Sequence, residues 1–309
     1  MVLVANCLGI EPEAQGQSGG AQGQLLKVEV EKQTGNYVFR YKDPDDSPVE
    51  VVFVPATKIK PEVRATISLD RETRLVLYEY QISNGEASKQ ELFNFKVKVI
   101  PPVENRKWPE GWYGFGPSPA TNVADWFQEK GATLVGGLVH RRGLPPGQSQ
   151  SGFSFQSPNL PGVATAYFRG NTPDWPNPPR LTHEVSREMS KYTWWEYDSV
   201  RKPTIGPAIQ VSDLDCYDPA VHLQRLQSHL AEQVPEEMLP DARLRADLKK
   251  GLARARQALQ ADHSGEASKQ LKALRRRLSV AGAKNISTDL RKALLINLDY
   301  LENRLPQAR

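Results

Sequence analysis

The sequence predicts a multidomain chain, in which an antiparallel β-sandwich is followed by a small antiparallel helical bundle. The first observation is a change of period. Apolar residues alternate with polar ones from Leu25 to about Gly170, as in strands with one buried face, whereas after about residue 215 they recur every three or four residues, as on one face of a helix. The second observation is charge, because the helical part is much more basic than the part before it.

The charge difference can be counted directly. Residues 241–309 hold 16 Lys and Arg against 7 Asp and Glu, a net charge of +9. The whole chain carries +4, so residues 1–240 carry 4 − 9 = −5. Since 309 residues exceed one typical domain of about 100 to 200 residues, we predict a β-sandwich domain over residues 24–212 and a helical bundle over residues 213–309.

Residues 1–23 are predicted to be a disordered lead-in or the remnant of a signal segment. The opening "MVLVANCLGI" is apolar, but it is too short to span a bilayer and lacks the basic start of an export signal. The Gly- and Gln-rich stretch that follows has no period. No other stretch of the chain resembles a transmembrane helix.

The strand predictions follow the alternation in order. The alternating segments are "LKVEVEK", "NYVFRYK", "VEVVFV", "VRATISLD", "LVLYEYQIS", "ELFNFKVKVI", "TLVGGLVH", "GFSFQS" and "VATAYFRG". The hexamer GEASKQ at 85–90 separates the fifth and sixth of these, which we predict to pair as a hairpin with Asn84 and Gly85 in its turn. Residues 101–130, rich in Trp, Pro and Gly, are predicted to form a structured loop.

Four helices are predicted after the change of period. Asp218 should cap the first helix with Pro219 at its first position, and the second should open near Asp241. A second GEASKQ, at 265–270, precedes the third leucine stripe, with Ser264 as its expected cap. The fourth stripe stops at Pro306. Both hexamers are expected at chain reversals, so their identity does not indicate an internal duplication.

Motifs for catalysis or metal binding are incomplete. "HEVSRE" begins like a zinc motif, but Arg187 stands where the second histidine must be, and in "GQSQSGF" Ser151 replaces the glycine that closes an esterase elbow. His222 and His229 are predicted to be packing or surface residues, and no glycine-rich phosphate loop is present. The two cysteines exclude a disulfide-dense scaffold. We therefore predict a protein that is not an enzyme and has no cofactor or bound metal.

Aromatic residues in the irregular segments are the first binding candidates. Their flat apolar faces and polar edges suit stacking on sugar rings or anchoring of a protein partner. The alternative is that these rings close the ends of the sandwich and cover its core. The candidate residues are Trp108, Trp112, Tyr113, Trp126, Trp175, Trp194 and Trp195.

Basic residues on the second and third predicted helices are the other candidates. Their charge could attract an acidic polysaccharide, nucleic acid or a membrane surface through salt-sensitive attraction. Aromatic residues that could stack on bases are nearly absent there, which argues against nucleic acid. The alternative is a solvated bundle face. The candidate residues are Lys249, Lys250, Arg254, Arg275, Arg276 and Arg277.

Two segments resemble known families. "LVLYEYQISNGEASKQELFNFKVKVI" with "GFSFQSPNLPG" resembles the immunoglobulin-like sandwich of secreted bacterial proteins. The Leu and Ala spacing of "LKKGLARARQALQADHSGEASKQLKALRRRL" and "LRKALLINLDYLENRL" resembles the helical hairpin domain called FIMAH, which is appended to bacterial extracellular proteins. The resemblance implies export and an accessory or adhesive role, and it supplies no catalytic residues.

These observations predict a non-enzymatic protein of the bacterial cell exterior, secreted, periplasmic or at the cell surface. It is expected to bind a cell-surface glycan or another extracellular protein through the aromatic loops. The alternative is an interaction module that holds an anionic polymer through the basic helices. A hydrolase with carboxylates brought together only in space is the third hypothesis.

Overall fold

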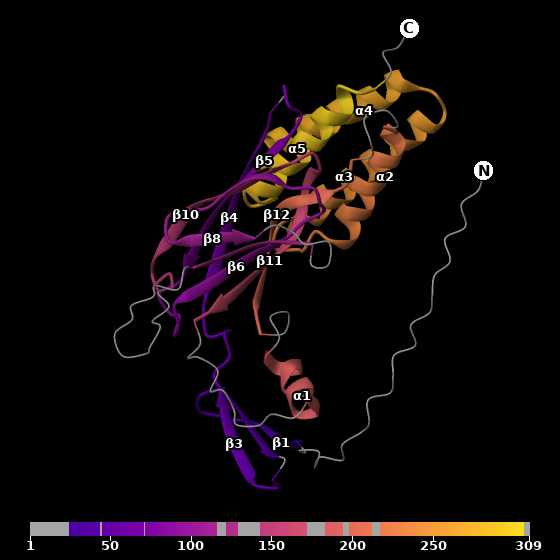
Figure 1. Cartoon of the computed structure of the whole chain (residues 1–309). Coiled ribbons are helices and arrows are strands. Elements are labelled where there is room, and N and C mark those ends of the chain that lie inside the picture. The colour runs from indigo at the N-terminus through magenta and orange to yellow at the C-terminus, as the bar shows by residue number, and fades with distance from the viewer. Residues whose placement is uncertain are drawn as a thin grey trace, which may run out of the picture. The chain divides into compact units, whose positions relative to one another are not determined.

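A computed structural model gives the fold. It describes residues 25–43, 45–70, 72–115, 122–128, 143–171, 183–193, 198–211 and 217–305. Antiparallel sheets occupy the described chain up to residue 209, and four helices follow, so the predicted order of fold classes is confirmed (Figure 1). The predicted strand "TLVGGLVH" and the lead-in 1–23 lie outside the described residues.

The chain divides into two compact units. One comprises Met1–Val54 with Asp174–Thr193, and the other comprises Pro55–Pro173 with Trp194–Arg309. The sandwich and the C-terminal helices therefore belong to one compact unit, and this division does not coincide with the predicted boundary at residue 213.

The first unit contains a three-stranded antiparallel sheet of β1 (Leu25–Val30), β2 (Tyr37–Lys42) and β3 (Pro48–Phe53), with helix α1 (His183–Thr193). Alternation places Phe39 and Val51 opposite each other on one face, where both are buried in a cluster with Val185 of α1. Helix α1 is an exception to the predicted β character of this region. Its apolar residues Val185, Met189 and Tyr192 recur at helical spacing in a segment too short for a clear periodic signal.

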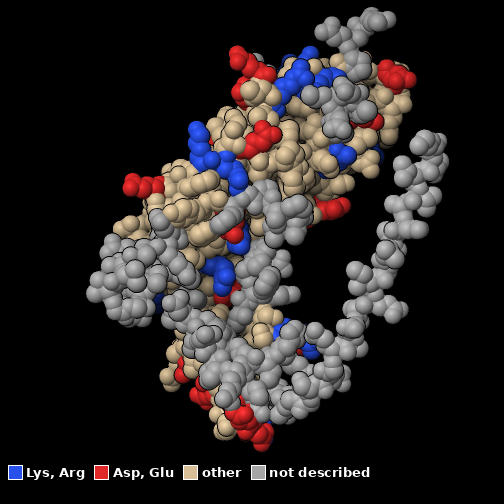
Figure 2. All heavy atoms as spheres, viewed as in Figure 1, with Lys and Arg blue, Asp and Glu red and all other residues tan. Residues whose placement is uncertain are grey.

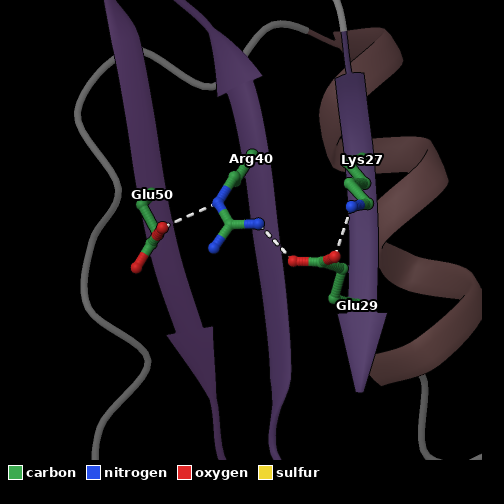
Figure 3. A network of polar contacts seen from close by, with 4 residues as sticks. All are labelled: Lys27, Glu29, Arg40 and Glu50. Atoms are coloured by element: carbon green, nitrogen blue, oxygen red, sulfur yellow. Dashed lines mark hydrogen bonds and ion pairs between the residues drawn. The ribbon is translucent and has the colours of Figure 1, made fainter. Parts of the chain in front are cut away.

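The other face of this small sheet carries a ladder of charges (Figure 3). Arg40 on β2 donates a hydrogen bond to Glu50 on β3 at 2.8 Å and contacts Glu29 on β1, which also pairs with Lys27. Hydrogen bonds from Lys27 and Arg40 lower the pKa of Glu29. These side chains are well exposed, so the ladder contributes little to stability and mainly fixes which charges lie opposite each other.

The second unit contains the β-sandwich. One sheet has the order β4-β5-β10-β7 and the other β12-β11-β6-β9-β8. The strands are β4 (Pro61–Leu69), β5 (Val76–Asn84), β6 (Leu92–Lys98), β7 (Glu104–Lys107), β8 (Trp112–Phe115), β9 (Val123–Gln128), β10 (Ser149–Ser157), β11 (Leu160–Gly170) and β12 (Val200–Ile209). Aromatic rings fill the space between the sheets. Tyr80 of one sheet meets Phe95 of the other edge to face, with 5.7 Å between ring centroids.

The predicted hairpin between β5 and β6 is wrong. Strand β5 pairs with β4 and β10, whereas β6 pairs with β11 and β9, so the first GEASKQ crosses from one sheet to the other. The amide of Asn84 is buried at the start of this crossing and donates to the carbonyls of Gln90 and Leu144. Alternation identifies the inward face of each strand, but it does not identify the partner strand.

The aromatic stretch 101–130 is also more regular than predicted. It contributes the short strands β7, β8 and β9 rather than a loop. Strand β8 pairs with β9, and β9 continues the sheet from β6. The strands are only four to six residues long and are separated by prolines and glycines, so the alternation of apolar and polar residues is too short to be recognised in the sequence.

Four antiparallel helices complete the second unit: α2 (Pro219–Glu232), α3 (Ala242–Gln260), α4 (Ser264–Val280) and α5 (Thr288–Glu302). The carboxylate of Asp218 accepts the N–H of Ala220 at 2.7 Å, so this predicted cap is confirmed. The second helix opens next to Asp241 as predicted, and the Asp241 carboxylate accepts the N–H of Leu244 at 2.9 Å. Ser264 is not a cap. The cap position of α4 is His263, which makes no capping hydrogen bond with its side chain, and the second GEASKQ lies inside the helix rather than in a reversal.

The helices pack directly on the sandwich. Helix α5 lies beside β4 and β11 (Figure 1), and one apolar core runs from the aromatic rings between the sheets into the leucines of the bundle. Polar contacts also fix this junction. The N–H of Val163 on β11 donates to Nε2 of His229 on α2 at 2.7 Å. A Cβ at Gly162 would lie 2.7 Å from the same Nε2, so only glycine allows this approach.

A second histidine of α2, His222, is linked to the sandwich through Asn297 of α5. The Asn297 amide of α5 donates to the carbonyls of Pro161 and Ala293, which leaves its Oδ1 as an acceptor. Because Nε2 of His222 lies 3.2 Å from that oxygen, Nε2 carries the proton. Both histidines therefore lie in packed surroundings, one of the locations predicted for them.

Candidate binding surfaces

The predicted aromatic residues divide into two groups. Trp112 and Trp126 are 3% and 1% exposed and belong to the core, whereas Trp108 and Tyr113 are 40% and 42% exposed. The structure therefore corrects the prediction for Trp112 and Trp126, because a ligand cannot stack on buried rings. It supports for these two residues the alternative that the rings cover the core. Trp175, Trp194 and Trp195 lie outside the described residues.

Strand geometry explains this division. Trp112 and Gly114 point inward from β8, and the residue between them, Tyr113, points outward. Trp126 stacks on Phe95 with 5.1 Å between centroids, and Trp112 meets Phe153 edge to face at 4.9 Å. These rings fill the core between the two sheets.

The two exposed rings have rigid supports. A Cβ at Gly114 would lie 2.6 Å from Cε3 of Trp108, so the Trp108 indole lies directly against that glycine. Tyr113 stacks on Phe127 of β9 with 6.1 Å between centroids and 25° between planes. Two preoriented aromatic rings thus remain accessible near the β8 edge of the five-stranded sheet.

The predicted basic residues lie on the solvent side of α3 and α4. Lys250, Arg254, Arg275, Arg276 and Arg277 are exposed and Lys249 is half-buried. The leucines of the same helices face the core. Figure 2 shows Lys and Arg side chains gathered over part of the helices near α4.

Two of these arginines have acidic partners. Arg275 pairs with Asp299 of α5 at 3.0 Å and with Glu302 at 3.7 Å, and Arg277 pairs with Asp247 of α3. Arg275 thus links α4 to α5, and Arg277 links α4 to α3. Their charges are partly neutralised, so they are weaker candidates for binding an external anion.

The remaining predicted residues form no ion pair within the described chain: Lys249, Lys250, Arg254 and Arg276. Segment Ala242–Val280 holds eleven Lys and Arg against three Asp and Glu, a net of 11 − 3 = +8. A spacing of four places Lys250 and Arg254 on one face of α3. We call Lys249, Lys250, Arg254 and Arg276 together the basic face. Its charge is offset only slightly by acidic neighbours in the sequence.

Arg245 of α3 has a structural role that none of the basic candidates has. Its guanidinium donates to the carbonyls of Val234 at 2.9 Å and of Pro235 and Leu239 at 3.1 Å, with a longer contact to Leu230. These are carbonyls at the end of α2 and in the turn after it. Arg245 therefore adds side-chain donors to carbonyls at the end of the helix and in the turn, beside the backbone hydrogen bonds from Met238 and Leu239 to Pro235. The sequence does not distinguish Arg245 from the other arginines of α3, whereas the structure shows that it is half-buried.

The residues that the structure describes form no metal-binding cluster. They contain no group of three or more His, Cys, Asp or Glu side chains suited to a metal ion. Within the same residues, no helix is long and apolar enough to cross a membrane.

Comparison with known proteins adds a fold likeness only. No family model matches the chain, and no curated protein matches it. Among solved structures, an uncharacterized protein from Nocardia farcinica with an immunoglobulin-like fold is similar over 46% of this chain and 96% of its own, with 15% identity and a TM-score of 0.26. At this level of similarity the match carries no information about function.

Proposed function

We propose that this protein is a non-enzymatic binding protein of the bacterial cell exterior that holds an acidic polymer on the basic face of α3 and α4. The observation that carries the proposal is the group of cations that have no acidic partner among the described residues, in a helix pair with a net charge of +8. Clustered positive charge attracts a polyanion at long range and releases counterions on binding. We further propose that the helices serve as an appended hairpin of the FIMAH kind.

The polymer is proposed to be an acidic polysaccharide rather than nucleic acid. Binding of single-stranded nucleic acid combines a cationic groove with aromatic rings on which bases stack. Segment Ala242–Val280 contains no Phe, Tyr or Trp. A polysaccharide with repeating sulfate or carboxylate groups can bind to the positive charges without aromatic rings.

The test is binding to a sulfated polysaccharide, heparin, as a function of salt. The variant combines Lys249→Gln, Lys250→Gln, Arg254→Gln and Arg276→Gln, and we expect it to lose at least tenfold in affinity at low salt. The control replaces four exposed lysines of the sandwich, Lys89, Lys98, Lys107 and Lys202, by Gln and should change affinity much less. Equal losses in the two variants, or an affinity that does not fall with salt, would contradict the proposal.

A second candidate function rests on two separate exposed rings, Trp108 against Gly114 and Tyr113 on the outward side of β8. Their fixed rings suit a sugar ring or a protein anchor. Neutral glycans provide the discriminating probe, because they offer no charge to the basic face. Binding of a neutral glycan that is lost in Trp108→Ala and retained in the helix variant would assign it to these rings.

A further inference from the structure

A cleft of about 500 Å³ lies between the turn after β4 and the C-terminal end of α5, on the same compact unit but outside the basic face. The turn contributes Leu69, Asp70 and Arg74, and α5 with its C-terminal cap contributes Ile296, Asp299, Tyr300, Asn303 and Arg304. This volume is within the range of pockets for small molecules. Its lining combines apolar surface with four charged side chains.

Both carboxylates of the cleft already have partners. Asp299 pairs with Arg275 of α4 at 3.0 Å. Asp70 accepts the backbone N–H groups of Glu72 at 2.9 Å and Thr73 at 3.3 Å, and hydrogen bonds of this turn lower its pKa. These partners offset part of the negative charge of each carboxylate, and neither carboxylate forms an ion pair with an arginine of the cleft among the described residues.

The two arginines have no such partners. Neither Arg74 nor Arg304 forms an ion pair or a side-chain hydrogen bond with any residue that the structure describes. Cζ of Arg304 lies 3.7 Å from the centroid of the Tyr300 ring, so the guanidinium is stacked and its N–H edges remain available. Arg74 is held at a left-handed position of the turn, with φ of 60°.

Tyr300 shows that both arginines act on the same region. Burial raises the pKa of Tyr300, and the positive charges of Arg304 and Arg74 oppose that rise. Both arginines also line the same cleft as the phenol. Leu69 and Ile296 provide half-buried apolar surface in the same cleft.

We propose that this cleft binds a small organic anion, in which a carboxylate or phosphate group bridges Arg74 and Arg304 and an apolar body lies against Leu69 and Ile296. Planar, stacked guanidinium groups bind such anions through paired N–H donors. Apolar contact favours an organic ligand over a bare inorganic ion. This proposal does not depend on the polymer site of α3 and α4.

Calorimetric titration with phenyl phosphate, benzoate, inorganic phosphate and benzyl alcohol tests the proposal. We expect saturable binding of phenyl phosphate or benzoate, at least tenfold weaker binding of inorganic phosphate and none of benzyl alcohol. Whichever organic anion binds more tightly identifies the preferred acidic group. Equal binding of phenyl phosphate and inorganic phosphate, or no saturable binding of either organic anion, would overturn the proposal.

Variants locate the binding. Arg74→Gln alters an exposed side chain and should weaken the preferred probe at least tenfold without affecting folding. Arg304→Lys keeps the charge but loses the planar stack, and it should weaken binding severalfold. Arg276→Gln, on the basic face, should leave the affinity unchanged. Full affinity in Arg74→Gln would refute the site, whereas loss of heparin binding alone in Arg276→Gln would concern only the polymer proposal.

Discussion

The candidate binding residues of the β-sandwich and those of the helical bundle differ in how many are exposed to solvent. In the sandwich, two of the four described aromatic candidates are core residues, Trp112 and Trp126, although they lie in a segment rich in loop-forming residues. In the bundle, the six basic candidates lie on the solvent side, five of them exposed and Lys249 half-buried. The residues chosen as surface candidates thus lie on the solvent side in the helices, but only some of them do in the strands.

The difference arises from how each element determines its inward face. A helix of four or five turns repeats its pattern often enough that the leucines fix the orientation of every other residue. A strand of four residues such as β8 offers only two positions on each face. The buried side of β8 is therefore decided by β9 and the opposite sheet, which the local sequence does not reveal.

The largest expected effect tests the burial of the aromatic candidates. Trp126→Ala should lower the free energy of unfolding by about 3–5 kcal/mol, because it removes a ring that contacts Phe95 and Phe153. Urea denaturation followed by circular dichroism measures this change. Trp108→Ala, the matched exposed residue, should cost about 0.5–1 kcal/mol. Similar losses for the two variants would contradict the division into core and surface rings.

The next effect concerns pH and the junction between bundle and sandwich. Burial lowers the pKa of His222 and of His229 from 6.5 to about 4. In the unfolded chain each histidine takes up its proton near pH 6.5, so the unfolded state binds more protons between pH 6.5 and 4. Stability should be complete above pH 6.5 and fall as the pH decreases through this window. The loss is at most about 3 kcal/mol for each histidine.

The surroundings of these histidines oppose protonation. Arg225 and Arg304 add positive charge near His222, and Nε2 of His229 is occupied as an acceptor of the Val163 N–H. Carboxylates also titrate at low pH, so the comparison must be between variants. In the double variant His222→Gln and His229→Gln, the free energy of unfolding should change less from pH 6.5 to 4 than in the native sequence. An unchanged pH dependence would show that the junction is not sensitive to these two groups.

The sequence predicted the order of sheet and helix, the cap at Asp218, the start of α3 near Asp241 and the location of the basic charges. Each rests on local information, such as Asp218 and Asp241 two or three residues ahead of the N–H groups that they accept. What it missed depends on distant contacts. The first GEASKQ joins two sheets because β5 and β6 find other partners. The second is helical because it lies in the first turns of α4, whose later leucines are buried in the bundle.

The candidate sites show the same limit. The cleft beside Tyr300 is formed by residues more than 200 positions apart, Arg74 and Arg304, and no motif in the sequence joins them. Whether an arginine has an acidic partner also depends on the tertiary structure. Arg275, Arg276 and Arg277 are adjacent, yet only the middle one has no acidic partner among the described residues.

The smallest expected effect separates a structural arginine from a surface one on the same helix. Arg245→Gln should lower the free energy of unfolding by about 1–3 kcal/mol, because it removes the donor to the carbonyls of Val234 and Leu239. Arg243→Gln removes the same charge from an exposed position two residues away and should stay within about 0.5 kcal/mol. Urea denaturation of the two variants measures the difference. If both lose equal stability, overall charge rather than the contacts of Arg245 is responsible, and the distinction between structural and binding arginines in the bundle fails.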